Sequence, residues 1–291
     1  MKTIRYLLTN PLSLIGLLLL TFFLVIALLA PFLAAPKAYQ SSPFQIPQKG
    51  FWAEPKPPSE DAPFGTTQNQ YDIYYGVIWG TRTAFKIGFG VVASATLIGI
   101  IVGSIAGLYG GMVDEVIMRM VDVFLSIPFL IGAMVLTTIL GKGLVTMIIA
   151  LTTFGWMSYA RIIRSEILHV REEEYVEAAR AIGSGIFRLS IKHVLPNSIY
   201  PVLVQSTMMT GSMVLTASAL SFLGVGTETG YADWGQLISF ARNWILGQGQ
   251  NPFHYWYTIF FPGLAIVLFV LAWNLVGDAL RDIMDPRLYR E

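Results

Sequence analysis

The chain has 291 residues, of which 54% are hydrophobic and only 13% are charged, and its formal net charge is +1. Typical soluble domains carry about 25% charged residues, so the composition disfavours a soluble fold, and the near-neutral charge gives no indication of nucleic-acid binding. The absence of cysteine excludes a disulfide framework and thiolate chemistry. Several apolar runs reach the ~20 residues that a membrane-spanning helix needs, which predicts a single all-α polytopic membrane protein.

The N-terminal part, residues 1–82, contains one apolar run and one proline-rich loop. Lys2 and Arg5 precede an almost purely apolar run at 11–30. This run is longer than the 7–15 residues of a signal-peptide core, which favours an uncleaved first span over a signal peptide cleaved near Ala34-Ala35. Prolines are dense in residues 31–75 and forbid a regular helix there. This segment is either a flexible extracytoplasmic linker or a loop that contacts a delivery protein.

The second part, residues 83–291, is predicted to be a five-span core, which gives six spans with both termini on one side. Lysine and arginine are more frequent in the segments that this topology places inside, so both termini are predicted to be cytoplasmic. In the third span, Asp122 is expected at the cytoplasmic interface near Arg119, and Pro128 is expected to kink the helix. The expected spans cover residues 11–30, 83–108, 116–140, 144–163, 199–223 and 256–280.

Small residues recur four apart along the second span, which places them on one helix face. Such a face allows backbones to approach closely. Packing within the subunit is the favoured interpretation, and an interface with a second membrane subunit is the alternative. The small residues are Ala95, Gly99, Gly103, Gly107 and Gly111.

The fifth span is unusually polar, which is compatible with an aqueous translocation path beside it. Hydroxyl groups in a membrane helix also bond to their own backbone, so a purely structural role remains open. The candidate path residues are Gln205, Ser206, Thr210 and Ser221. In the outer loop that follows, apolar residues recur at helical spacing between Trp234 and Ile245, which predicts an amphipathic helix lying at the outer membrane face.

No enzymatic motif is found in the sequence. The three histidines are isolated, and neither HExxH nor GxSxG occurs. Gly141-Lys142-Gly143 lacks the Ser or Thr that follows the lysine of a phosphate-binding loop. We therefore predict that the chain is not an enzyme and binds no cofactor, so any ATP and Mg²⁺ must be bound by other subunits.

The longest charged segment between apolar spans covers residues 161–198. Its pattern predicts two short helices that are broken at 183–185 and stopped by Pro196. Ala178 and Ala179 permit close approach of another surface, and Glu177 offers a carboxylate to a partner's arginine. These properties fit a hairpin packed on its own bundle as well as they fit a docking helix.

A resemblance decides between these two interpretations. Glu177-Ala178-Ala179, Gly183 and His193-Val194-Leu195-Pro196, in this order and spacing, resemble the EAA loop in permease subunits of bacterial ABC importers. Further motifs narrow the resemblance to the C-type permease subunit of dipeptide and oligopeptide transporters. These are Pro63-Phe64-Gly65-Thr66, Gly80-Thr81-Arg82, Ser218-Ala219-Leu220-Ser221-Phe222-Leu223-Gly224 and Asp285-Pro286-Arg287. One departure is Gln70-Tyr71-Asp72, where the usual pattern has Gly-Arg-Asp.

The resemblance implies a six-helix permease fold in a bacterial inner membrane, forming half of a heterodimeric pore that imports di- or oligopeptides. The implied partners are a second permease subunit, two cytoplasmic ATPases that bind ATP and Mg²⁺, an extracytoplasmic binding protein and the peptide itself. Import of nickel or another small solute, or a self-sufficient secondary transporter, are the alternatives. The residues implied to couple to the ATPase are Glu174, Tyr175, Glu177, Ala178, Ala179, Arg180, Gly183 and Pro196.

Overall fold

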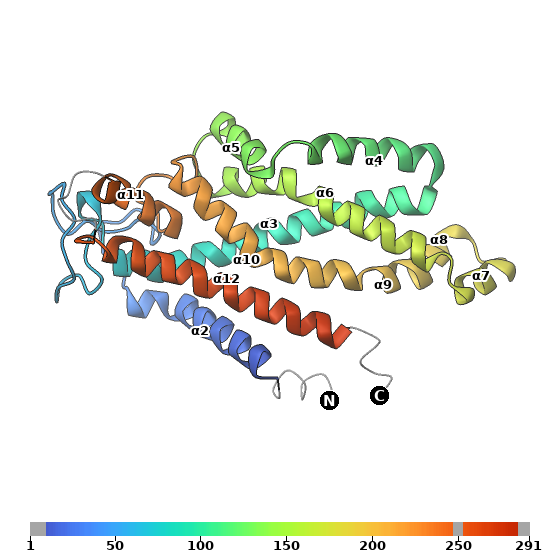
Figure 1. Ribbon diagram of the computed structural model, residues 1–291, viewed down its shortest axis with the longest axis horizontal. Helices are drawn as coiled ribbons and strands as arrows, with labels where there is room; N and C mark the ends of the chain where they lie inside the picture. Colours follow the sequence, from blue (N-terminus) through green and yellow to red (C-terminus); the bar gives the residue numbers. More distant parts are fainter. Residues whose placement is uncertain (1–9, 247–252, 285–291) are drawn as a thin grey trace.

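The computed structural model describes residues 10–246 and 253–284, and all regular elements within these ranges are helices. Lys2, Arg5 and the motif Asp285-Pro286-Arg287 lie outside the described residues. The helices form an elongated bundle with the proline-rich segment at one end (Figure 1). They are α2 (Pro11–Leu33), η1 (Gln68–Gln70), α3 (Ile73–Tyr109), α4 (Gly111–Leu125), α5 (Phe129–Leu140), α6 (Leu144–Val170), α7 (Glu174–Ala181), α8 (Ile186–Leu189), η2 (Ser190–Val194), α9 (Leu195–Ser198), α10 (Tyr200–Phe222), α11 (Trp234–Leu246) and α12 (Tyr257–Met284).

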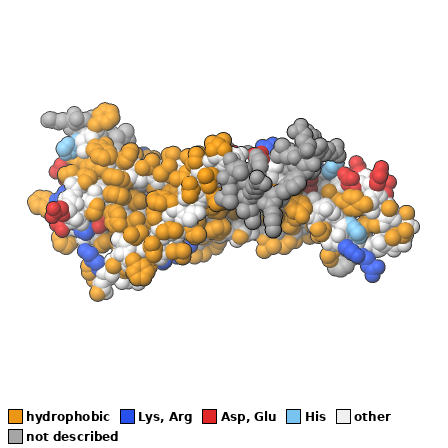
Figure 2. Space-filling model, turned by 90° about the horizontal axis from the view of Figure 1, so that it is seen from below, with side chains coloured by type: hydrophobic (Ala, Val, Ile, Leu, Met, Phe, Trp, Pro, Cys, Tyr) orange, Lys and Arg blue, Asp and Glu red, His pale blue; other side chains and the backbone are white. Residues whose placement is uncertain are grey.

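Among the described residues, four helices are long and apolar enough to cross a membrane, namely α2, α3, α6 and α12. The pair α4 and α5 makes a fifth if it counts as one broken span. The expected fifth span of the sequence, α10, is 23 residues long but is not among them, because its many hydroxyl residues lower its hydropathy. Hydrophobic side chains cover the middle of the molecule, and charged side chains gather at its two ends (Figure 2).

The third predicted span is broken rather than kinked. The axes of α4 and α5 differ in direction by 84°, with Pro128 directly before α5. Because Pro128 has no N–H to donate to the carbonyl of Phe124, that carbonyl accepts from the Ile127 N–H at 3.1 Å in a tight turn. The chain thus turns sharply where the sequence predicted a bend.

The glycine ladder of α3 packs against α6 inside the subunit, as the favoured interpretation predicted. A Cβ atom built on Gly103 would lie 2.2 Å from the carbonyl oxygen of Ala160. One built on Gly99 would lie 2.5 Å from Cβ of Tyr159. Only glycine permits this approach, so α3 and α6 are joined almost backbone to backbone.

An arginine holds α2 against α3. Pro31 lies inside α2 and cannot donate to the carbonyl of Ala27. The Arg82 Nε of α3 donates to that Ala27 carbonyl, and its Nη2 donates to the Leu28 carbonyl at 3.3 Å. Arg82 also lies over the ring of Trp79, 5.0 Å from its centroid. The arginine therefore supplies the hydrogen bond that the proline removes, which matters in a membrane where no water can do so.

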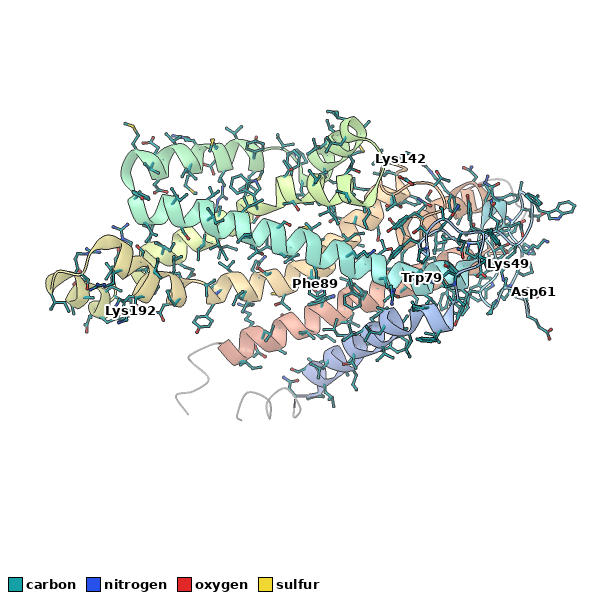
Figure 3. The ribbon with its side chains drawn as sticks, turned by 180° about the vertical axis from the view of Figure 1, so that it is seen from behind. Lys49, Asp61, Trp79, Phe89, Lys142 and Lys192 are labelled. Atoms are coloured by element: carbon teal, nitrogen blue, oxygen red, sulfur yellow. The ribbon has the colours of Figure 1, made fainter. Side chains whose placement is uncertain are left out.

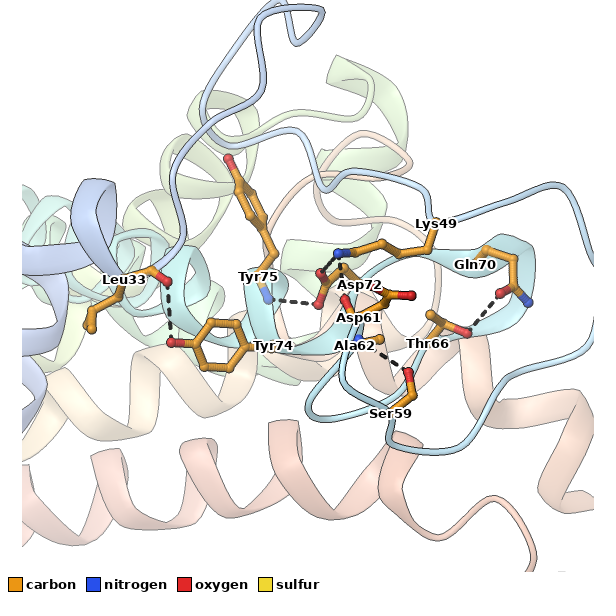
Figure 4. A network of polar contacts seen from close by, with 10 residues as sticks. All are labelled: Leu33, Lys49, Ser59, Asp61, Ala62, Thr66, Gln70, Asp72, Tyr74 and Tyr75. Atoms are coloured by element: carbon orange, nitrogen blue, oxygen red, sulfur yellow. Dashed lines mark hydrogen bonds and ion pairs between the residues drawn. The ribbon is translucent and has the colours of Figure 1, made fainter.

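The proline-rich segment is a packed cap on one end of the bundle rather than a flexible linker. Asp72 caps the N-terminus of α3 by accepting from the Tyr75 N–H at 3.1 Å, and it pairs with Lys49 at 3.2 Å (Figure 4). Lys49 also donates to the Asp61 carbonyl at 2.7 Å. This cap extends α3 outward to Ile73, well beyond the residues 83–108 expected for its span.

Gln70 occupies an unusual backbone position in the cap. Its φ angle is 60°, in the left-handed region that favours glycine, and glycine is the residue of the usual pattern. The Gln70 side chain is fully buried, accepts from Thr66 Oγ1 at 3.2 Å and donates to the Glu54 carbonyl. The buried amide thus compensates for an unfavourable backbone.

The apolar face of helix α11 packs on the protein. Trp234, Leu237 and Ala241 are buried, and the Trp234 indole donates to the Val77 carbonyl of α3 at 3.0 Å. The amphipathic pattern therefore predicted the helix correctly. The apolar face of this helix covers the bundle formed by α3, α10 and α12.

Candidate functional site

The charged segment forms the end of the molecule opposite the cap (Figure 1). It begins where α6 leaves the bundle and includes α7, α8, η2 and α9. Val176, Leu189 and Val194 belong to one buried cluster with Ile163 and Ile167 of α6. The segment is therefore anchored to the bundle by its own apolar residues, while the side of α7 that faces away from the bundle is exposed.

Helix α7 has two faces. Val176 and Ala179 are buried in that cluster, so Ala179 faces its own bundle. Tyr175 and Ile182 are exposed, with 44% and 85% of their surface accessible, and Ala178 is exposed between them. Together with Ile182, the residue that directly follows α7, these side chains form an exposed apolar surface.

The turn after α7 has the geometry of a Schellman motif. Gly183 has a φ angle of +86°, its N–H donates to the Arg180 carbonyl at 3.0 Å, and the Ser184 N–H donates to the Ala179 carbonyl at 3.1 Å. A left-handed residue is required here, which explains Gly183. Pro196 does not stop a helix as predicted, because it lies in the first turn of α9, where its missing N–H is not needed.

The charged residues of α7 are available for a partner. Glu174 and Glu177 lie in its first turn and Arg180 in its last, the arrangement that favours the helix dipole. All three are exposed, and none of them forms an ion pair within the described ranges. They are therefore free to form charge-assisted hydrogen bonds with another protein.

Three arginines of α6 and its end tie this segment to the bundle. Arg171 donates to the Gly107 carbonyl at the end of α3 at 2.7 Å. Arg164 pairs with Asp114 of α4 through two bonds of 2.7 and 2.5 Å. Asp122 pairs with Arg161 at 2.5 Å, whereas the sequence predicted that Asp122 would lie near Arg119. These contacts connect the end of α6 to α3 and α4.

The four candidate path residues do not line one surface. Ser206 and Thr210 line a groove of about 420 Å³ between α3, α10 and α12. Gln205 is half-buried and is not part of that groove lining. Ser221 is buried near the outer end of α10, where its hydroxyl donates to Asp233 at 2.6 Å.

Asp233 is the centre of a buried hydrogen-bond network that was not predicted from the sequence. It accepts from Ser221, from Thr227 at 3.2 Å and from the Gly235 N–H at 2.8 Å. Burial raises the pKa of Asp233, and the hydrogen bonds from Ser221, Gly235, Gln236 and Thr227 oppose this rise. The signal was present, since an Asp followed three residues later by Gln at a helix start resembles a capping box.

Comparison with known proteins places this architecture in a family. Residues 99–290 match the model of the "binding-protein-dependent transport system inner membrane component", and residues 2–58 match the "N-terminal TM domain of oligopeptide transport permease C". Two solved structures share the fold. The inward-facing MetNI methionine ABC transporter has a TM-score of 0.58 at 19% identity, covering 72% of this chain and 97% of the other. An amino acid ABC transporter has a TM-score of 0.55 at 17% identity, covering 71% and 94%.

Curated relatives match over almost the whole chain. The dipeptide transport system permease protein DppC of Alkalihalophilus pseudofirmus is 35% identical, with 96% of this chain and 87% of that protein covered. DppC of Bacillus subtilis is 35% identical, covering 98% and 85%. The oligopeptide transport system permease protein OppC of Bacillus subtilis is 34% identical, covering 96% and 87%. The chain belongs to the family of inner-membrane permease components of binding-protein-dependent transport systems.

Proposed function

We propose that this chain is one half of a heterodimeric pore that imports di- or oligopeptides with energy from ATP hydrolysed on two partner ATPases. The dipeptide and oligopeptide permeases named above support peptides over nickel or another small solute. An extracytoplasmic binding protein delivers the peptide on the side of the cap. The proposal places both termini and α7 in the cytoplasm of a bacterium, with the membrane around the apolar middle.

The surface of α7 carries this proposal. It presents Tyr175, Ala178 and Ile182 with Glu177 and Arg180 beside them, all exposed, on a helix whose other face is anchored in the bundle. An apolar centre with a charged rim is the usual anatomy of a protein interface. Glu174 and Gly183 complete the predicted coupling element, with Gly183 setting the turn, while Ala179 and Pro196 contribute to its shape.

Coupling requires that the partner contacts α7 differently in two states, because only a difference in interaction free energy shifts a conformational equilibrium. ATP binding that closes the two ATPases would move both coupling elements. Arg171 and the paired Arg164 pass this movement to α3 and α4, and the pore opens outward. Hydrolysis resets the ATPases, and the pore faces the cytoplasm again.

The test uses Ile182→Asp in the reconstituted complex of two permeases, two ATPases and the binding protein. Because Ile182 is 85% exposed, the substitution leaves folding intact, but it places a charge at the centre of the interface. We expect co-purification with the ATPases and ATP-dependent peptide uptake to fall about tenfold or more. Ile191→Asp, at a residue 52% exposed in η2, is the matched control.

Two results would refute the proposal. Ion-driven uptake by the chain alone would identify a secondary transporter. Normal ATPase binding and uptake by Ile182→Asp would show that α7 is not the coupling surface.

A further inference from the structure

An exposed lysine lies inside a membrane-spanning helix. Lys86 belongs to α3, one turn after Arg82, and its side chain is exposed. The backbone of Lys86 lies one turn further along α3 than that of Arg82, and its ammonium reaches back to the Phe44 ring of the cap. A charged residue of a membrane-spanning helix is costly against lipid and usually faces a wet cavity or a ligand.

Lys86 is held in place without being neutralised. Its Nζ lies 3.7 Å from the centroid of the Phe44 ring. Phe44 is itself fixed, because it stacks on Tyr231 with centroids 5.4 Å apart and meets Trp79 edge to face at 5.3 Å. No carboxylate of residues 10–246 or 253–284 forms an ion pair with Lys86. The ammonium therefore has a defined position and keeps its charge available.

Neighbouring cations are already engaged. Arg82 donates to the two carbonyls of α2 and covers Trp79. Lys49 pairs with Asp72 in the cap. The position that is arginine in the usual Gly-Arg-Asp pattern is here Tyr71, which stacks on Phe240 of α11. Lys86 is therefore the cation of α3 that remains free to meet an anion at the outer side.

The groove between α3, α10 and α12 begins one turn further along α3. Phe89 lines it and lies three residues after Lys86, which places the two side chains on neighbouring positions of one helix face. Trp79 and Phe89, which flank Lys86 in the chain, both belong to α3 (Figure 3). Phe89 thus brings this groove of about 420 Å³ to within one turn of Lys86 along α3.

The groove wall offers hydrogen-bond acceptors but no charge. Thr96, Ser206, Thr207 and Thr210 contribute hydroxyls, and Trp273 contributes an aromatic ring. The hydroxyls of Ser206, Thr207 and Thr210 donate to backbone carbonyls of α10. The Ser206 hydroxyl also bonds the Thr96 hydroxyl at 2.8 Å, and each of these oxygens keeps a lone pair that can accept from an amide N–H. Such a wall suits a peptide backbone of any sequence.

We propose that Lys86 binds the C-terminal carboxylate of the transported peptide at the outer mouth of the α3–α10–α12 groove. The inference rests on the proposed peptide import. An ammonium of fixed position favours a carboxylate through a charge-assisted hydrogen bond. The hydroxyl wall next to it receives the amides of the same peptide. Lys86 is then a specificity-determining residue for free peptides over peptides without a terminal charge.

The test compares one peptide with a free C-terminus and the same peptide with a C-terminal amide, in the reconstituted complex. Uptake of each is measured for the unsubstituted chain and for Lys86→Met, Lys86→Arg and Lys142→Met. Lys142, on an exposed outer turn (Figure 3), is the matched control. Comparing the ratio of the two uptake rates between variants cancels any preference of the binding protein, because that protein is the same throughout.

We expect Lys86→Met to lower uptake of the free peptide about tenfold or more and to change uptake of the amide less than twofold. Lys86→Arg keeps the preference for the free peptide, and Lys142→Met behaves as the unsubstituted chain. An equal loss for both peptides, or no loss, overturns the inference while peptide import stands. A loss that follows the content of anionic lipid in the vesicles, and not the peptide terminus, assigns Lys86 to a lipid phosphate and overturns it too. If the unsubstituted complex takes up neither peptide, the proposed function fails, and the inference fails with it.

Discussion

Replacement of Arg82 by alanine tests whether the arginine compensates for the proline in α2. Arg82→Ala leaves the Ala27 carbonyl without a donor, because Pro31 has no N–H. An unsatisfied buried acceptor costs about 1–3 kcal/mol, and Ala27 is only 7% exposed. The lost contact with Trp79 adds about 0.5–1 kcal/mol. We expect the free energy of unfolding in detergent to fall by about 2–3 kcal/mol, measured by denaturant unfolding followed by tryptophan fluorescence.

The double substitution separates the two contributions. In Pro31→Ala the new N–H donates to the Ala27 carbonyl, so Arg82→Ala should cost about 1–2 kcal/mol less in this background. Arg242→Ala is the control, since Arg242 lies over the Phe222 ring at 5.8 Å and should cost the same in both backgrounds. Equal costs of Arg82→Ala with and without Pro31 would refute the compensation.

Three further predictions concern the ends of the molecule. Burial raises the pKa of Asp233 above its ordinary 3.8, so the folded state binds the carboxyl proton more tightly than the unfolded state does. The contribution of Asp233 to the free energy of unfolding therefore falls as the pH rises above about 3.8. Asp233→Asn should remove this slope in unfolding measured against pH, and an unchanged slope would contradict it. Gln70→Gly relieves about 1 kcal/mol of backbone strain, but it loses two side-chain hydrogen bonds and leaves the Glu54 carbonyl without its donor. We therefore expect the free energy of unfolding, measured by chemical denaturation, to fall by about 1 kcal/mol. An increase would show that the backbone strain dominates. Gly183→Ala forces a left-handed alanine at φ +86° and should lower the stability measured by thermal unfolding by about 1–2 kcal/mol. Gly185→Ala is the control and should be nearly neutral, because Gly185 has equally open surroundings and no positive φ. Similar effects of the two substitutions would contradict the turn assignment.

Much of the bundle follows from local patterns in the sequence. Apolar runs located α2, α3, α6 and α12, because length and hydropathy are properties of a single segment. The four-residue spacing of Gly99, Gly103 and Gly107 predicted close packing within the subunit, and α6 is the helix that fills this face. The motif order predicted the family, which the comparisons confirm.

Features that depend on distant contacts were not predictable in the same way. The order of the cap depends on Lys49 meeting Asp72 and on Tyr255 donating to Glu54 at 2.7 Å, and proline density alone indicates only that no helix forms. The apolar face of α11 fits lipid or protein equally well until its neighbours are known. Ser206 and Ser221 belong to one polar helix, but their separation along α10 places one in a groove and the other beside Asp233.

The unbroken length of α6 has a mechanical consequence. Its 27 residues extend about 40 Å from the α7 segment to Gly143, whose N–H donates to the Gly226 carbonyl at 3.1 Å. The glycine contacts fasten α3 along this rod, so the two helices form one stiff unit. A tilt of about 10° about the α7 end would displace the Gly143 end by about 7 Å, roughly the width of an extended peptide chain. Under the proposed coupling mechanism, a small rotation at the α7 end would therefore become a large displacement at the loop that contains Gly226.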